Sequence, residues 1–219
     1  MKKTFDTKKL VMLSLFCAIA YLSVFILRIP MVSFLKYEPK DVIITLCALI
    51  CGTIPTIMVS IVVSFIEMVT ISDNGPIGLL MNILATLSFS LPVAILYKKK
   101  KSLNRAVIGL LIGTIAMTAI MILWNYLITP IYLGVPRDVV IDMLVPVFLP
   151  FNILKGIINS TFVFLLYKPL ISALRQSKLI VKSNEDLSDG KKQAIIFNII
   201  SVAILIICIA LWIVWKINQ

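Results

Sequence analysis

The stretch Pro150-Phe-Asn-Ile-Leu-Lys155-Gly-Ile-Ile-Asn159-Ser160 places a lysine between two asparagines inside a long apolar segment. A lysine at the centre of a membrane helix is disfavoured by about 3 kcal/mol on insertion scales. Asn152, Lys155 and Asn159 are spaced i, i+3 and i+7, so they share one helical face. Such a face points toward other helices or a cavity, because lipid would leave its polar groups unsatisfied. We therefore expect a membrane helix whose polar face points inward.

The composition indicates an integral membrane protein. Of the 219 residues, 60% are hydrophobic, compared with roughly 45–50% in soluble domains. Histidine is absent, which removes the commonest general base and the commonest transition-metal ligand. The four cysteines lie in apolar runs without metal-ligand spacing, so we expect buried small side chains and no metal site.

Apolar segments long enough to span a bilayer, roughly 20 residues each, predict an all-α fold. Six segments precede residue 176, at about 10–27, 41–51, 54–71, 79–97, 106–127 and 139–166. The second is too short to cross alone without thinning of the membrane or deep burial of the segment. We expect a six-helix domain over 1–176, a cytoplasmic linker over 177–192, and an additional C-terminal transmembrane helix within 193–219.

The basic residues predict how these segments are oriented. Fifteen of the 21 Lys and Arg residues lie near the N terminus, around 98–105, or between 168 and 192. Four lie on the opposite side, namely Arg28, Lys36, Lys40 and Arg137. By the positive-inside rule, the N terminus is expected in the cytoplasm. The net charge of +11 is then explained by topology, and no nucleic-acid partner is expected.

Two interpretations of Lys155 remain open from the residues alone. In the first, Lys155 forms an ion pair with Glu67, taken as the one carboxylate deep in an apolar segment, and ties two helices together in a structural or assembly subunit. In the second, Lys155, Asn152 and Asn159 line a ligand pocket that opens to the outside. Asn125 either joins that pocket or forms an interhelical hydrogen bond.

No catalytic arrangement is recognisable in the sequence. There is no GxxxxGK[ST] phosphate loop, and no Cys or His accompanies a nucleophile. We therefore expect a protein that is not an enzyme. An ATP-driven role would need an ATPase supplied by partner subunits.

Three motifs together resemble a known family. They are Phe34-Leu-Lys-Tyr-Glu-Pro39, Gly75-Pro-Ile-Gly-Leu-Leu-Met-Asn82 and Pro150-Phe-Asn-Ile-Leu-Lys-Gly156. With the six apolar segments, over about 5–176, the chain resembles the riboflavin-specific S component of the energy-coupling factor (ECF) vitamin transporters. The resemblance implies a multi-pass subunit of the bacterial cell membrane. Such a subunit binds riboflavin from outside and docks on a transmembrane coupling protein with two ATPases.

The resemblance also implies which residues bind riboflavin, the transported ligand; no cofactor is expected. Asn152 and Lys155 would contact the flavin ring, while Asn125 and the outer loops would contact the ribityl chain and cover the site. An amide matches the N–H and carbonyl groups of the flavin edge, and a lysine donates to its acceptors. The full expected set is Asn152, Lys155, Asn125, Leu35, Lys36, Tyr37, Gly75, Pro76, Gly78 and Asn159.

Small residues on the first segment resemble the family's docking pattern. Ser14-x-x-x-Ala18, with Ala20 nearby, is expected to contact the coupling protein, and packing inside the bundle is the alternative. Another vitamin or flavin mononucleotide is the alternative ligand. A phosphate would require more positive charge than Lys155 and Lys36 provide. The seventh segment departs from the six-helix pattern, and no role is assigned to it.

Overall fold

The computed structural model describes residues 7–32, 35–72, 74–99, 102–177, 179 and 203. Nearly all of the expected linker and of the seventh apolar segment lies outside these residues, as does Phe34 of the outer-loop motif. The domain boundaries therefore stay predictions.

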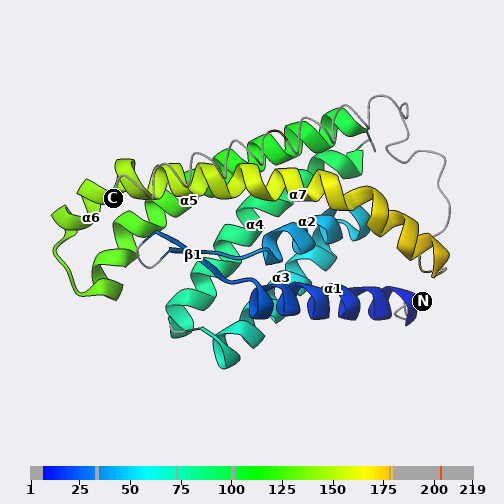
Figure 1. Ribbon diagram of the computed structural model, residues 1–219, viewed down its shortest axis with the longest axis horizontal. Coiled ribbons are helices and arrows are strands. Elements are labelled where there is room, and N and C mark those ends of the chain that lie inside the picture. The colour runs from blue at the N-terminus through cyan, green and yellow to red at the C-terminus, as the bar shows by residue number, and fades with distance from the viewer. Residues whose placement is uncertain are drawn as a thin grey trace, which may run out of the picture.

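The described residues form helices and one β-hairpin. In chain order these are α1 (Thr7–Ile26), β1 (Ile29–Val32), β2 (Leu35–Tyr37), α2 (Lys40–Cys51), α3 (Thr53–Thr70), α4 (Gly75–Lys99), α5 (Leu103–Leu133), α6 (Arg137–Met143), a π-helical segment (Leu144–Phe148) and α7 (Leu149–Gln176). The long helices run along the long axis of the molecule, and the hairpin and α6 lie toward the end away from the beginning of α1 (Figure 1).

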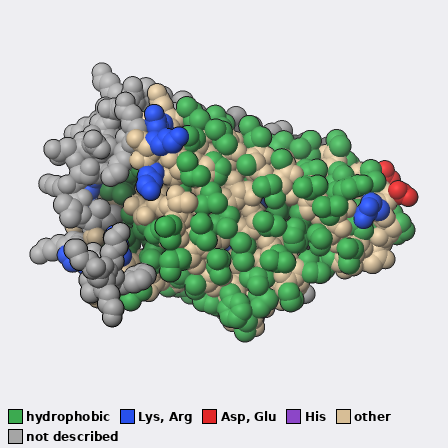
Figure 2. Space-filling view, turned by 180° about the vertical axis from the view of Figure 1, so that it is seen from behind, with side chains coloured by type: hydrophobic (Ala, Val, Ile, Leu, Met, Phe, Trp, Pro, Cys, Tyr) green, Lys and Arg blue, Asp and Glu red, His purple; other side chains and the backbone are tan. Residues whose placement is uncertain are grey.

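The helices form a membrane bundle. Five described helical stretches are long and apolar enough to cross a membrane: Thr7–Ile26, Thr53–Thr70, Gly75–Lys99, Leu103–Leu133 and Arg137–Gln176. Hydrophobic side chains cover most of the length of the visible face, and charged side chains gather toward the two ends (Figure 2). The sequence predicted six segments in this region, and the difference is α2.

Helix α2 is an inner helix of the bundle. Its 12 residues span only about 18 Å, less than the roughly 30 Å of a hydrocarbon core. It contacts α1, α3, α4 and α7, and most of its side chains are buried. Of the two alternatives for this short segment, the structure therefore shows deep burial. From the sequence, Lys40 is expected on the outer side, just before this segment. The structure instead makes it the first residue of α2, with 1% of its surface exposed.

Two outer connections are more regular than expected. The connection over 28–40, between the first two predicted helices, contains an antiparallel hairpin in which Ile29 pairs with Tyr37 and Pro30 pairs with Lys36. The connection between the third and fourth predicted helices, expected to run to residue 78, is shorter, because α4 already begins at Gly75. Gly75 has a φ of 53°, a left-handed conformation that glycine adopts at little cost.

The sixth predicted segment is continuous but changes its helix type. A π-helical segment joins α6 to α7, and Pro146 and Pro150 lie within and just after it. Proline removes one backbone donor and clashes with the carbonyl four residues earlier, so a regular α-helix is disfavoured here. The π segment directly precedes Asn152 and Lys155, which places the irregular backbone beside the polar face of α7.

Helices α4 and α5 approach closely at two glycines. A Cβ atom at Gly109 would lie 2.8 Å from the Cα of Val93, and one at Gly113 would overlap the carbonyl oxygen of Phe89. Gly109-Leu-Leu-Ile-Gly113 is a G-xxx-G motif, which lets membrane helices pack backbone against backbone. The sequence analysis did not use this motif.

Gly113→Ala tests this contact. Alanine favours a helix over glycine by about 1 kcal/mol, but its methyl group meets a backbone atom that no rotamer change can move. We expect overpacking to dominate and to cost about 1–3 kcal/mol, seen as a lower midpoint of thermal unfolding in detergent. Ala119→Val adds volume at an exposed position of α5 and should leave the midpoint unchanged. A Gly113→Ala protein at least as stable as the wild type would contradict the close contact.

Candidate functional site

A cavity of about 320 Å³ lies between the hairpin and the adjoining ends of α4, α5 and α7. This volume falls in the range of small-molecule sites, about 300–1,000 Å³. The wall combines apolar side chains with amides and charged groups. The lining residues are Arg28, Leu35, Lys36, Glu38, Ser72, Asn74, Ile77, Gly78, Met81, Asn82, Ala85, Met121, Trp124, Asn125, Ile128, Thr129, Tyr132, Phe151, Asn152 and Lys155.

Most of the residues expected to bind the ligand lie on this wall. The six that do are Leu35, Lys36, Gly78, Asn125, Asn152 and Lys155. These residues are far apart in the sequence, and the fold brings them together from four elements. Their expected contacts with a ligand stay predictions.

Four expected residues do not line the cavity: Tyr37, Gly75, Pro76 and Asn159. The Tyr37 hydroxyl donates to Asn159 Oδ1 over 3.0 Å, and both side chains are buried. This pair therefore joins the hairpin to α7. Gly75 and Pro76 form the first turn of α4, where Pro76 is exposed. The sequence pattern alone could not tell which side of its element each of these residues faces.

The two predicted amides that line the cavity, Asn152 and Asn125, are held by their own helices. Asn152 Nδ2 donates to the Phe148 carbonyl of the π segment over 2.8 Å. Asn125 Nδ2 donates to the Met121 carbonyl over 2.7 Å, and its Oδ1 accepts from Thr129 Oγ1 over 2.8 Å. A carboxamide has two N–H donors and an acceptor oxygen, so Asn152 retains hydrogen-bonding capacity toward the cavity.

Lys155 pairs with a carboxylate that the sequence analysis did not consider. Its Nζ lies 2.9 Å from Asp41 Oδ2. Asp41 is fully buried, and its Oδ1 accepts from Thr86 Oγ1 over 2.6 Å. The expectation that Glu67 is the one deep carboxylate was wrong, because the buried start of α2 carries Asp41 into the interior. Lys155 therefore pairs with Asp41, and not with Glu67 as in the first of the two interpretations.

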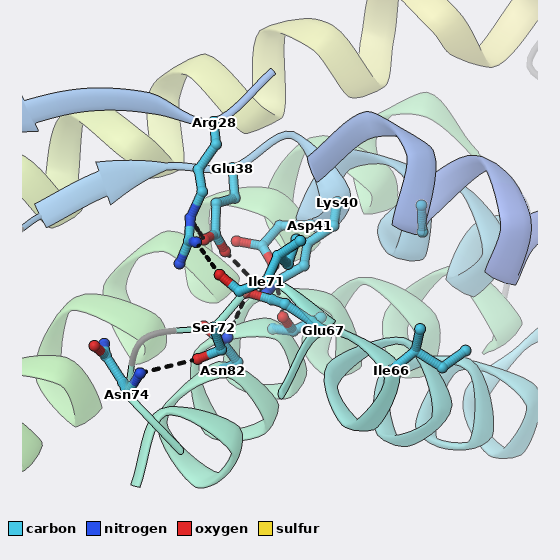
Figure 3. Close-up of polar contacts among 12 residues, drawn as sticks. Arg28, Glu38, Lys40, Asp41, Ile66, Glu67, Ile71, Ser72, Asn74 and Asn82 are labelled. Carbon is cyan, nitrogen blue, oxygen red and sulfur yellow. Dashed lines mark hydrogen bonds and ion pairs between the residues drawn. The ribbon is translucent and has the colours of Figure 1, made fainter. Parts of the chain in front are cut away.

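A second set of charged side chains connects the residues that flank the hairpin to α3 (Figure 3). Lys40 Nζ contacts Glu67 Oε2 and lies 2.9 Å from Glu38 Oε2. Arg28 reaches Glu38 Oε1 over 3.1 Å and donates to the Ile71 carbonyl over 2.7 Å. Glu67 also accepts a hydrogen bond from Asn82, a cavity-lining residue, over 2.9 Å.

Opposite charges surround Glu38 on the cavity wall. Burial alone would raise the pKa of its carboxyl, but Lys40, Lys155 and Arg28 together lower the pKa to about 2. Glu38 is therefore ionised at neutral pH. Buried charges are tolerated when they are paired, and here each cationic side chain has a carboxylate partner.

Several lining residues escaped the sequence analysis. Trp124 and Phe151 lie beside predicted asparagines, and the Tyr132 hydroxyl donates to Asn74 Oδ1 over 2.6 Å, which joins α5 to the start of α4. Arg28 and Glu38 could have been found from their neighbourhood, since charges cluster where the hairpin region meets an apolar run. Nothing in the sequence marks Ile77, Met81 or Ile128, because apolar residues fill every segment.

The predicted docking residues lie on different sides of α1. Ser14 and Ala18 are exposed, whereas Ala20 has no exposed surface and packs in the core. Ala20 is thus not part of an outer surface, because it lies roughly 200° around the helix from Ala18 at about 100° per residue.

The wall suits a small molecule with an apolar body and several hydrogen-bonding groups. Apolar and aromatic side chains supply the contact area, and the amides and charges orient polar groups. Within the described ranges, no group of three or more His, Cys, Asp and Glu residues could hold a metal ion.

Comparisons with known proteins agree with this reading. A family model described as "ECF transporter, substrate-specific component" matches residues 8–167. The chain is 30% identical to the riboflavin transporter FmnP of Bacillus subtilis (strain 168), over 78% of this chain and 98% of the relative. It is 32% identical to the riboflavin transporter RibU of Staphylococcus aureus (strain TCH60), over 78% of this chain and 94% of the relative.

A solved structure shows the same architecture. It is described as "Structure and mechanism of the S component of a bacterial ECF transporter", with a TM-score of 0.64 and 32% identity over 77% of this chain and 98% of that one. The family model covers well over half of the sequence, and the relatives are matched along nearly their whole length. The chain therefore belongs to the substrate-specific components of the ECF transporters.

Proposed function

We propose that this chain is the riboflavin-binding subunit of an ATP-driven ECF importer and captures riboflavin at the outer face of the bacterial cell membrane. The observation that carries the proposal is the cavity with Asn152 and Lys155 on one side and Asn125 on another. The two relatives described above are both riboflavin transporters, and their name supports the choice of ligand.

The chemistry of the wall fits a flavin ring. The uracil-like edge of the ring presents an N–H between two carbonyls, and the Asn152 amide offers the complementary donor and acceptor. Lys155 is a donor only and suits carbonyl or ring-nitrogen acceptors. Trp124 and Phe151 supply aromatic surface for the flat tricycle.

The remaining polar wall fits the ribityl chain. Its four hydroxyls both donate and accept, and Glu38, Asn74 and Asn82 line the cavity with acceptors and amides. A site that relies on hydrogen bonds discriminates steeply, because a wrong ligand leaves buried polar groups unpaired. An uncharged ligand is favoured over flavin mononucleotide, since Lys155 and Arg28 are each engaged with a carboxylate.

The alternative of a structural or assembly subunit has lost its main support. It depended on an ion pair between Lys155 and Glu67, and those side chains have other partners. Another vitamin remains the alternative within transport.

We infer an orientation with the N terminus in the cytoplasm and the cavity outside. The cavity lies at the start of α4, so the basic connection between α4 and α5 lies at the opposite end of the bundle. The positive-inside rule assigns that connection to the cytoplasm. The transmembrane coupling protein and two ATPases would then supply energy, and Ser14 and Ala18 on α1 would contact the coupling protein.

Riboflavin binding is tested by fluorescence-quenching titration of the purified protein. We expect saturable quenching at or below micromolar riboflavin. Lys155→Met should weaken binding by about 2 kcal/mol, or roughly 30-fold, because a charged hydrogen-bond donor is lost. Lys98→Met, at the far end of α4, should bind as the wild type does. No quenching of the wild type at micromolar riboflavin would refute the proposed function.

The orientation is tested by thiol labelling of single-cysteine variants in a chain whose native cysteines are replaced by alanine. Asp142→Cys on α6 should react with a membrane-impermeant maleimide in intact cells. Ser102→Cys, between α4 and α5, should react only after permeabilisation. The reverse pattern would show that the cavity opens to the cytoplasm.

The docking surface is tested by Ala18→Trp. We expect this variant to bind riboflavin normally but to lose co-purification with the coupling protein, because the bulky ring blocks close helix packing. Ile19→Trp is the matched control, because this exposed residue lies about 100° around the helix. Equal co-purification of both variants would place the docking surface elsewhere.

A further inference from the structure

Asp41 has an unusual position relative to the cavity. It is not among the residues that line the cavity and has no exposed surface. Its carboxylate nevertheless contacts Lys155, which does line the cavity. Asp41 can therefore affect a bound ligand only through a neighbouring side chain.

Two helices fix the Asp41 carboxylate. One oxygen accepts from Thr86 Oγ1 of α4 over 2.6 Å, and the other lies 2.9 Å from Lys155 Nζ of α7. Thr86 is fully buried and, like Asp41, lies off the cavity wall. A carboxylate held in this way offers the lysine one defined position, because neither oxygen can move without losing a partner.

A second carboxylate competes for the same ammonium group. Glu38 interacts electrostatically with Lys155, lines the cavity, and is already paired with Arg28 and Lys40. Without the negative charge of Asp41, we expect Glu38 to attract the Lys155 ammonium group, because opposite charges nearby attract more strongly in a buried site. Its ammonium group then leaves the position that Asp41 defines, and a ligand has to reorder a long, flexible side chain.

We propose that Asp41 is a positioning residue that, held by Thr86, sets the Lys155 ammonium group at the cavity wall before the ligand arrives. Such preorganisation strengthens binding because the ordering of the lysine precedes association. The inference rests on the proposed function, since riboflavin is the ligand that Lys155 would contact.

A double-mutant cycle separates positioning from a general structural role. Riboflavin dissociation constants are measured by fluorescence quenching for the wild type, Asp41→Asn, Lys155→Met and the double variant. We expect Asp41→Asn to weaken binding at least tenfold. In the Lys155→Met background the same change should alter binding less than twofold, because the group that it positions is gone. Asp142→Asn, at an exposed carboxylate of α6, should stay within twofold of the wild type.

Thr86→Val provides a second route that keeps every charge. It removes the hydrogen bond to Asp41 with little change in shape, so it keeps the inference testable if Asp41→Asn does not fold. We expect about threefold or more weaker binding with Lys155 present and no change in the Lys155→Met background. Size-exclusion profiles and thermal midpoints verify that each variant is folded.

The possible failures are distinguishable. If the effects of the two sites multiply in the double variants, or if Asp41→Asn and Thr86→Val bind riboflavin like the wild type, the positioning role is overturned. If the wild type does not bind riboflavin, the proposed function itself fails.

Discussion

The neutralisation of buried charges at the start of α2 is the constraint on which the rest of the described structure depends. Helix α2 is too short to cross a membrane and stays inside the bundle, so Lys40 and Asp41 enter the interior with it. The free-energy cost of burying unpaired charges at this depth would be too high for a stable fold, whereas paired charges are tolerated. Partners come from the hairpin, α3 and α7, and these contacts determine where those elements lie.

The binding site is a consequence of the same contacts. Arg28 ties the hairpin to the end of α3, and the Tyr37–Asn159 hydrogen bond ties it to α7. The hairpin is thereby held over the ends of α4, α5 and α7, where the cavity forms. Glu38 and Lys155 form buried ion pairs with Lys40 and Asp41 of α2 and also line the cavity. The groups that stabilise the fold therefore also set the electrostatics of the site. Stability and ligand recognition are therefore not independent in this molecule.

The sequence predicted the helical membrane fold and the inward polar face of α7, because apolar runs and the i, i+3, i+7 spacing are local signals. It missed the partners of the buried charges. Lys155 and Asp41 are 114 positions apart in the chain, and no local pattern connects them. The hairpin was missed because its strands have only four and three residues. Asn152 lines the cavity, whereas Asn159 is bonded to Tyr37. Spacing alone cannot reveal this difference, because both residues lie on the same face of α7.

The π-helical segment has a consequence for how this chain tolerates change in length. A π turn holds about one residue more than an α turn, and each residue of a helix turns the chain by about 100°. The direction in which the Asn152 and Lys155 side chains point therefore depends on the number of residues between α6 and α7. A loop can accommodate an inserted or deleted residue, but the same change in this continuous helical stretch would rotate the polar face of α7 about the helix axis. Among related proteins, the number of residues from Arg137 to Asn152 should therefore vary far less than the lengths of the outer loops.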